Sequence, residues 1–161
     1  SGSVGESTVS GSPVVVEEPR AEAKELPASG PLDSLLEATA GIGERKELAP
    51  LVKVRHILIA WRQLSPAYKG KMDERAAERT REEANERIGE CIGKLKGGED
   101  FQQLMETYSE DASSLKKGKP YVVTPSAGFV PPFKNVSLRL KKGEQALVES
   151  VYGWHLIERV E

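Results

Sequence analysis

The stretch Val54-Arg55-His56-Ile57-Leu58-Ile59 predicts a buried β-strand with a histidine near its middle. It belongs to a longer run, residues 51–61, that is dense in Val, Ile and Leu. The second of the chain's two histidines lies in a similar run, Gly153-Trp154-His155-Leu156-Ile157-Glu158. Two such runs, far apart in sequence, can be neighbouring strands of one sheet, which would bring both imidazole rings to one site. Taken singly, each histidine is more simply interpreted as a structural residue of its strand.

Length and composition set broad limits on the function. The 161 residues fit one domain, and a net charge of −2 provides no field that would attract nucleic acid or an anionic membrane. The single cysteine excludes an internal disulfide. Cys91 falls on an apolar stripe with Ile88 and Leu95 at helical spacing, so we expect a buried core thiol. No run is long and apolar enough to predict a membrane span.

The composition changes near residue 50. Residues 1–50 are rich in Gly, Ser, Pro, Ala and Glu and contain no aromatic residue, which predicts a flexible tether. Within it, Leu32, Leu35 and Leu36 share a helical face, so a short helix is expected there, either transient or docked on the domain. Residues 51–161 are expected to form the folded domain.

The pattern from residue 51 onward is a strand, two helices, a loop, a helix and two strands. A polar loop at 62–72 precedes a long helix that ends near residue 96 and begins at Asp73 or at the capping box Thr80-Arg81-Glu82-Glu83. A second helix begins at Asp100, and a short one follows Pro131-Pro132. The last two strands are expected at residues 145–149 and 154–160.

Six short segments, taken together and in order, resemble the parvulin family of peptidyl-prolyl cis/trans isomerases. They are His56-Ile57-Leu58, Gly98-Glu99-Asp100-Phe101, Tyr108-Ser109-Glu110-Asp111-Ala112-Ser113-Ser114, Phe129-Val130-Pro131-Pro132-Phe133, Gly143-Glu144 and Tyr152-Gly153-Trp154-His155-Leu156-Ile157. The resemblance covers residues 51–161. It implies an α+β, parvulin-like domain, in which helices surround a four-stranded, mainly antiparallel sheet in the order β-α-α-α-β-α-β-β. The small second strand would lie near residues 121–123.

The resemblance also implies catalytic residues. His56 and His155 would face one another beneath the substrate, and Asp111 would lie over the same spot. Ser150 would join the histidine network, and the alternative is the nearby hydroxyl of Tyr152.

A substrate pocket is implied in the same way. The proline ring would rest on Phe129 and Phe133. The family's Gly-Gly-Asp-Leu-Gly segment, which supplies a Leu to the pocket, reads here as Lys117-Gly118-Lys119-Pro120-Tyr121-Val122. Tyr121 or Val122 would therefore replace that Leu.

These residue types suit prolyl isomerisation on chemical grounds as well. Rotation about an X-Pro bond crosses a barrier of about 20 kcal/mol because it breaks amide resonance, and catalysis needs no cofactor, metal or covalent step. An apolar slot for the ring, with polar groups that fit the rotated carbonyl, lowers the barrier by differential binding. The alternatives are a metal site of two His and one Asp, ordinary core packing for Phe129 and Phe133, and a turn carboxylate for Asp111. The histidines lack the close spacing of helical zinc motifs, which disfavours metal.

We therefore expect a prolyl isomerase that acts as a monomer on proline-containing peptides or unfolded protein clients, without nucleic acid. The alternatives are a peptide-binding chaperone module that isomerises poorly, or a purely structural interaction domain. The basic residues Arg62, Lys69 and Lys71 lie in a loop where some parvulins bind phosphate, but their scattered placement predicts no strong phosphate requirement. A long tether before a foldase domain suits a bacterial extracytoplasmic or periplasmic location, and the alternative is cytoplasmic.

Overall fold

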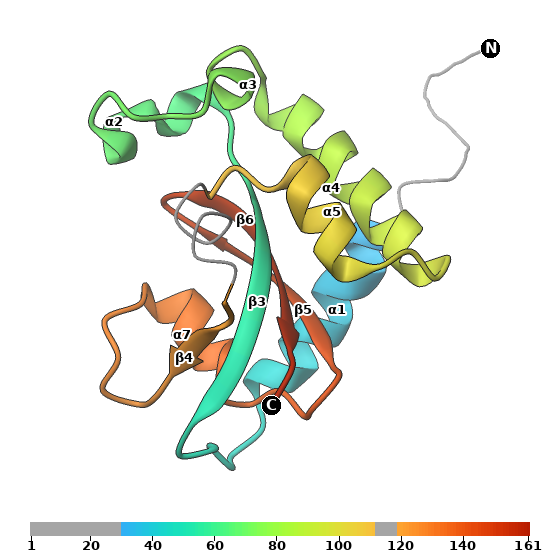
Figure 1. Ribbon diagram of the computed structural model, residues 1–161, viewed down its shortest axis with the longest axis vertical. Coiled ribbons are helices and arrows are strands. Elements are labelled where there is room, and N and C mark those ends of the chain that lie inside the picture. The colour runs from blue at the N-terminus through green and yellow to red at the C-terminus, as the bar shows by residue number, and fades with distance from the viewer. Residues whose placement is uncertain (1–29, 112–118) are drawn as a thin grey trace, which may run out of the picture.

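The computed structural model describes residues 30–111 and 119–161 (Figure 1). Its helices in chain order are α1 (Pro31–Gly43), the 3-10 turn η1 (Arg62–Leu64), α2 (Ser65–Tyr68), α3 (Glu74–Ala77), α4 (Arg81–Lys96), α5 (Phe101–Tyr108) and α7 (Pro131–Ser137). Its strands are β3 (Val52–Ile59), β4 (Tyr121–Val123), β5 (Gln145–Ser150) and β6 (Gly153–Arg159).

The strands form one sheet in the order β4-β3-β6-β5, and all three neighbouring pairs are antiparallel. The two histidine-bearing strands, β3 and β6, are therefore neighbours in the middle of the sheet, as the sequence predicted. The expected α+β fold with a four-stranded antiparallel sheet is confirmed.

Both faces of the sheet are covered, which explains why the strand at 51–61 is apolar almost throughout. Ile57, Ile59 and Leu156 belong to a buried cluster with α4 and α5 on one face. Val54 and Ile157 belong to a second cluster with α7 on the other face. In Figure 1, α4 and α5 lie on the side of the sheet opposite α7. We refer to the side covered by α7 as the α7 face, and the candidate site lies on it.

Local sequence signals define the helix starts. Thr80 and Glu83 form the predicted capping box at the start of α4, and the Asp100 side chain accepts a hydrogen bond from the Gln103 N–H at the start of α5. The expected loop at 62–72 is more structured than predicted. Residues 62–68 fold into η1 and α2, because proline at position 66 fits the first turn of a short helix.

The helix α1 corrects the expected boundary at residue 50. It packs on the domain through Leu35 and Ile42, so the docked alternative describes it, and the packed part of the chain includes Pro31–Gly43. The Thr39 hydroxyl accepts a hydrogen bond from the Leu147 N–H at 2.9 Å and donates to the Leu35 carbonyl at 2.7 Å. Since β5 is an edge strand, α1 thereby covers a backbone group that would otherwise be free. The remainder of the expected tether, residues 1–29, lies outside the described residues.

Cys91 is completely buried in α4, which confirms the expected core thiol. Burial raises the pKa of this thiol to about 12, so it stays protonated at neutral pH. Among the described residues, none of the helices has the length and apolar character needed to cross a bilayer.

Candidate active site

A cavity of about 560 Å³ opens on the α7 face of the sheet. Six of the residues singled out from the sequence line it: His56, Asp111, Tyr121, Phe129, Phe133 and His155. They come from β3, from the segment after α5, from β4 and the loop that follows it, from α7 and from β6. The fold thus assembles, in one hollow, side chains that are distributed over about a hundred residues of sequence.

The strand register brings the two histidines together. Leu58 lies directly opposite His155, so His56, two residues earlier on β3, is the diagonal neighbour of His155 on the same face. The two Nδ1 atoms lie 3.2 Å apart. The rings are stacked at an interplanar angle of 11°. Both residues are about 95% buried, so this contact is made without competing water.

A chain of hydrogen bonds continues from both ends of the histidine pair. His56 Nε2 lies 2.8 Å from Asp111 Oδ2, which also accepts a hydrogen bond from the Tyr121 hydroxyl at 2.7 Å. At the other end, His155 Nε2 lies 2.6 Å from Ser150 Oγ. That oxygen in turn accepts the Tyr152 N–H at 3.0 Å. We call this series, Asp111-His56-His155-Ser150, the polar chain.

The chain has one consistent direction when both rings are neutral and Asp111 is ionised. The carboxylate only accepts, so His56 must carry its proton on Nε2 and accept at Nδ1. His155 must then donate from Nδ1 and accept at Nε2 from the Ser150 hydroxyl. Every donor and acceptor of the two rings is satisfied by this arrangement, as buried polar groups require.

The charge environment favours a neutral His155. Burial and, to a smaller extent, the neighbouring His56 lower the pKa of His155 to about 3, while Asp111 acts in the opposite direction. The ring is therefore uncharged at neutral pH, in agreement with the hydrogen-bond directions.

Aromatic rings form one wall of the cavity. Phe133 is almost fully buried, and its ring centroid lies 5.2 Å from that of Phe129 and 5.2 Å from that of His56. The ring of Tyr121 lies 5.3 Å from Phe129 and 5.4 Å from His56. We call Phe129, Phe133 and Tyr121 the aromatic wall. It lies directly beside the polar chain, since both Phe133 and Tyr121 contact the His56 ring.

Of the two residues predicted to replace the family's Leu, only Tyr121 lies in the cavity. Val122 is 47% exposed and is absent from the cavity lining. The reason is the alternation of side chains along a strand: Tyr121 pairs with Val54 on the α7 face, so Val122 points to the other side. Of the two alternatives, Tyr121 is thus the one that lines the cavity, and Val122 does not.

Asp111 is held in place by the two residues before it. The Leu58 N–H donates to Ser109 Oγ at 3.1 Å, and the Glu110 N–H donates to the Leu58 carbonyl at 2.7 Å. The Glu110 carboxylate accepts the Ala60 N–H at 2.8 Å. The segment after α5 is thus attached to the end of β3, which places Asp111 above His56.

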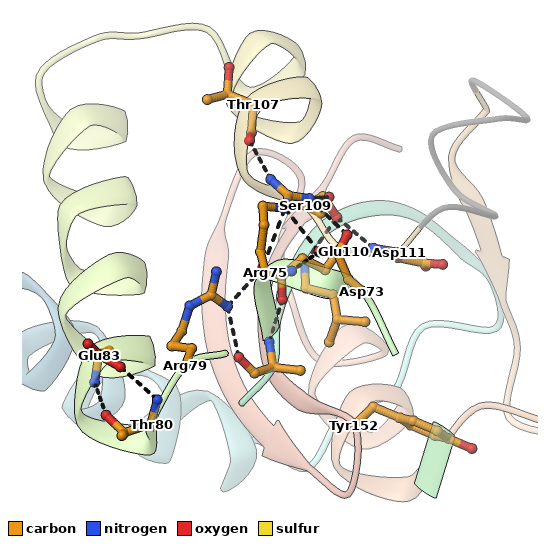
Figure 2. A network of polar contacts seen from close by, with 12 residues as sticks. Asp73, Arg75, Arg79, Thr80, Glu83, Thr107, Ser109, Glu110, Asp111 and Tyr152 are labelled. Carbon is orange, nitrogen blue, oxygen red and sulfur yellow. Dashed lines mark hydrogen bonds and ion pairs between the residues drawn. The ribbon is translucent and has the colours of Figure 1, made fainter. Parts of the chain in front are cut away.

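Two arginines attach this segment to the region before α4 (Figure 2). Arg79 Nη1 lies 2.8 Å from Glu110 Oε2 and donates to the Ala60 carbonyl at 2.9 Å. Arg75 donates to the carbonyls of Thr107 and Ser109 at 3.1 and 3.2 Å. Burial raises the pKa of Glu110, whereas the Ala60 N–H and Arg79 act in the opposite direction.

The rim of the cavity contains Tyr68, which the sequence did not single out as a site residue, next to Tyr152. Tyr68 and Tyr152 contact each other edge to face, with their ring centroids 5.5 Å apart, and the Tyr68 hydroxyl donates to the Tyr152 carbonyl. Lys71 also lines the rim. Tyr68 was missed because residues 62–72 were interpreted as a polar loop. The available signal was an aromatic residue inside that polar loop, since the whole chain has only four tyrosines.

The arrangement does not resemble a metal centre. Within residues 30–111 and 119–161, no group of three or more His, Cys, Asp and Glu side chains is placed to hold a metal ion. Both histidine Nδ1 atoms point at each other, and both Nε2 atoms contact other side chains.

Comparison with known families agrees with this geometry. The model of the PPIC-type PPIASE domain matches residues 40–161, which include every element of the sheet and the whole polar chain. The chain belongs to this family. The resemblance to parvulins is therefore confirmed, and with it the expected enzyme class, peptidyl-prolyl cis/trans isomerase.

Individual relatives support the family assignment. The chain is 33% identical over 127 residues to the chaperone SurA of Pseudomonas savastanoi pv. phaseolicola, an alignment that covers 77% of this chain and 26% of SurA. It is 31% identical over 96 residues to the foldase protein PrsA of Oceanobacillus iheyensis, with 59% of this chain and 32% of PrsA covered. The chain thus spans between a quarter and a third of the length of these relatives.

A solved structure shows the same fold. Peptidyl-prolyl isomerase ESS1 from Candida albicans superposes with a TM-score of 0.59 at 21% identity, covering 80% of this chain and 74% of that one. At this identity the likeness concerns the fold alone.

Proposed function

We propose that this domain catalyses cis/trans isomerisation of X-Pro bonds in peptides or unfolded protein clients, as a single chain and without a cofactor. The proline ring would rest on the aromatic wall, and the amide before it would lie over the polar chain. The observation that carries the proposal is that the aromatic wall and three members of the polar chain, Asp111, His56 and His155, line the same 560 Å³ cavity.

The mechanism needs differential binding only. In the twisted transition state the amide loses conjugation, and its carbonyl points in a direction that neither ground state presents. Dipoles that are already fixed in direction stabilise that geometry without reorganising. The polar chain supplies such dipoles, because Asp111 and the Tyr152 N–H determine the hydrogen-bond direction at its two ends. The aromatic wall would bind ground and transition states alike.

Exchange NMR of a short Ala-Pro peptide tests this proposal, because it measures the cis/trans rate and the binding shifts in one sample. We expect accelerated exchange, with shifts at the aromatic wall and the polar chain. Asp111→Ala should lower the rate more than it lowers affinity, since it removes an end of the polar chain. Ser126→Ala, in an exposed loop outside the cavity, serves as the matched control. Unaccelerated exchange together with binding at the cavity would contradict catalysis.

A second candidate is a peptide-binding chaperone module with weak isomerase activity. It is favoured by Tyr121, which places a phenol where the family has a Leu. The Tyr121 hydroxyl donates a hydrogen bond to Asp111. The relatives named chaperone SurA and foldase PrsA agree with either candidate. In the same experiment, Tyr121→Leu should raise the rate if the phenol holds Asp111 away from the substrate.

A further inference from the structure

A second hollow, of about 740 Å³, lies outside the proposed site. It is formed by residues 45–49 after α1, residues 138–141 after α7 and the end of β6. Its charged lining residues are Arg45, Lys46, Glu47, Arg139, Lys141 and Arg159. We call this hollow the basic groove. Five cations and one carboxylate gather there although the whole chain has a net charge of −2.

Most of this positive charge is not compensated within the part of the chain that the structure describes. Only Arg45 has an ion pair there, with Glu144 at 2.7 Å. Arg139 donates to the carbonyls of Arg45 and Asn135, and Arg159 donates to those of Leu140 and Glu161. The hydrogen bonds of Arg139 go to uncharged carbonyls, so they hold its guanidinium group in place without neutralising it.

The basic groove and the proposed active site lie at the two ends of α7, on the same face of the sheet. Phe133 lines the cavity and residue 138 lines the groove, about 7.5 Å further along the helix axis. The distance along the sheet between the two hollows is similar. Arg159 pairs with Val54, which is two residues, or about 7 Å, from His56 along β3.

The exposed side of α7 connects the two hollows. Pro132 and Asn135 are exposed, and Arg139 follows four residues later at the groove. Pro132 and Asn135 lie three residues apart on one side of α7, and Arg139 follows in the turn after the helix, where it donates a hydrogen bond to the Asn135 carbonyl. An extended polypeptide advances about 3.3 Å per residue, so about two to three residues would cover the roughly 7.5 Å between the two hollows.

We propose that the basic groove binds an acidic segment of the client polypeptide, which begins about two to three residues from the isomerised proline. This inference rests on the proposed function, since it places the client in the active site. The lining also includes Leu48, which is 48% exposed, and Leu138. A groove that combines apolar and cationic side chains suits a peptide of acidic and apolar residues better than a uniformly charged nucleic-acid backbone.

The test uses peptides that share one Ala-Pro bond and differ in their extension. Two peptides carry three Glu beginning about two to three residues before or after the proline. Two others carry Gln instead, and a fifth has no extension. Exchange NMR with the full chain gives kcat/KM for each. We expect one Glu peptide to exceed its Gln counterpart by about tenfold at low salt, with the difference shrinking as salt screens the charges.

Charge reversal in the groove supplies the control. Lys46→Glu and Lys141→Glu change exposed residues of the groove, whereas Lys96→Glu makes the same change at the end of α4. The first two should each abolish the preference for Glu and leave the short peptide unaffected. Lys96→Glu should preserve the preference.

The outcomes separate this inference from the proposed function. If none of the five peptides were isomerised, the proposed function itself would be contradicted. Turnover with equal kcat/KM for the Glu and Gln versions, in both directions, would overturn the groove assignment alone, as would a preference that survives both Lys46→Glu and Lys141→Glu. Binding to phosphatidylserine vesicles that is lost in Lys46→Glu, with no peptide preference, would assign the groove to a membrane surface instead.

Discussion

The buried Glu110–Arg79 ion pair should be indispensable to the position of Asp111, and the variant Glu110→Gln tests this. The Glu110 side chain is 1% exposed and that of Arg79 is 9% exposed, so neither group has water as an alternative partner. Glutamine keeps the size of the side chain but leaves the guanidinium without its counter-charge. Breaking a buried pair on one side typically costs about 3–5 kcal/mol, and we expect a loss in this range.

Urea unfolding of Glu110→Gln measures this loss, and the Arg81–Glu149 pair provides the matched control. Its side chains are 45% and 40% exposed, at a distance of 2.8 Å equal to that of the buried pair. Glu149→Gln should therefore cost less than about 1 kcal/mol. In the double variant Arg79→Met/Glu110→Met, the cost should be smaller than the sum of the single costs, because no unpaired charge remains.

The effect should extend to catalysis. Because Glu110 holds the segment that carries Asp111, isomerisation by Glu110→Gln should fall even at temperatures where the variant is fully folded. Glu149→Gln should retain its activity. If Glu110→Gln and Glu149→Gln lost equal, small amounts of stability, the buried pair would not be what positions Asp111, and the reasoning above would be refuted.

Three further perturbations test the wall, the sheet and the polar chain. Phe133→Ala should lower the unfolding free energy by about 3–5 kcal/mol and weaken peptide binding in calorimetric titration; unchanged affinity in the folded variant would contradict the wall. Gly153→Ala should cost about 3 kcal/mol or more, because φ is 125° and a Cβ would lie 2.5 Å from the Ile59 carbonyl oxygen. Gly89→Ala, with open space in α4, should gain about 0.5–1 kcal/mol, and equal urea midpoints for the two would refute this contrast. The pKa of His155, about 3 when folded against about 6.5 when unfolded, means that the unfolded chain binds the extra proton, so stability should fall as pH falls below 6.5, by about 2 kcal/mol at pH 5. Urea titrations of His155→Gln should show a correspondingly flatter pH profile, and ¹⁵N shifts should locate the ring protons on Nε2 of His56 and Nδ1 of His155; an unchanged profile or the reverse tautomers would contradict the polar chain.

The central pairing of the fold could be predicted from the sequence because its signals are local. Val54–Ile59 and Gly153–Glu158 are apolar enough to require burial on both faces, and two such strands have few places in a small domain other than side by side. The register of these two strands then places His56 and His155 next to each other on one face. The capping box at Thr80 was predictable for the same reason, since all its partners lie within three residues.

Contacts between distant polar residues could not be predicted in this way. Thr39 contacts β5 only because β5 is an edge strand, and the sequence does not state which strand is at the edge. Arg79 and Glu110 are charged residues that composition alone places on the surface. Their burial depends on how the segment before α4 crosses the end of β3. Whether Tyr121 or Val122 lines the cavity could not be decided either, because a shift of one residue in a strand moves a side chain to the opposite face.

The polar chain and the aromatic wall are in direct contact, because the ring of His56 belongs to the polar chain and packs against the wall. That ring contacts Phe133 at 5.2 Å and Tyr121 at 5.4 Å between centroids, while both of its nitrogens are engaged in the polar chain. Tyr121 makes a second connection between the two, because its ring packs on Phe129 and its hydroxyl donates a hydrogen bond to Asp111. A displacement of the wall must therefore turn the His56 ring and alter the hydrogen bonds on either side of it. For a reaction that forms no covalent bond to the protein, catalysis depends on how firmly dipoles are fixed relative to the bound ring. The His56 imidazole thus connects the hydrogen bonds of the polar chain to the packing of the aromatic wall.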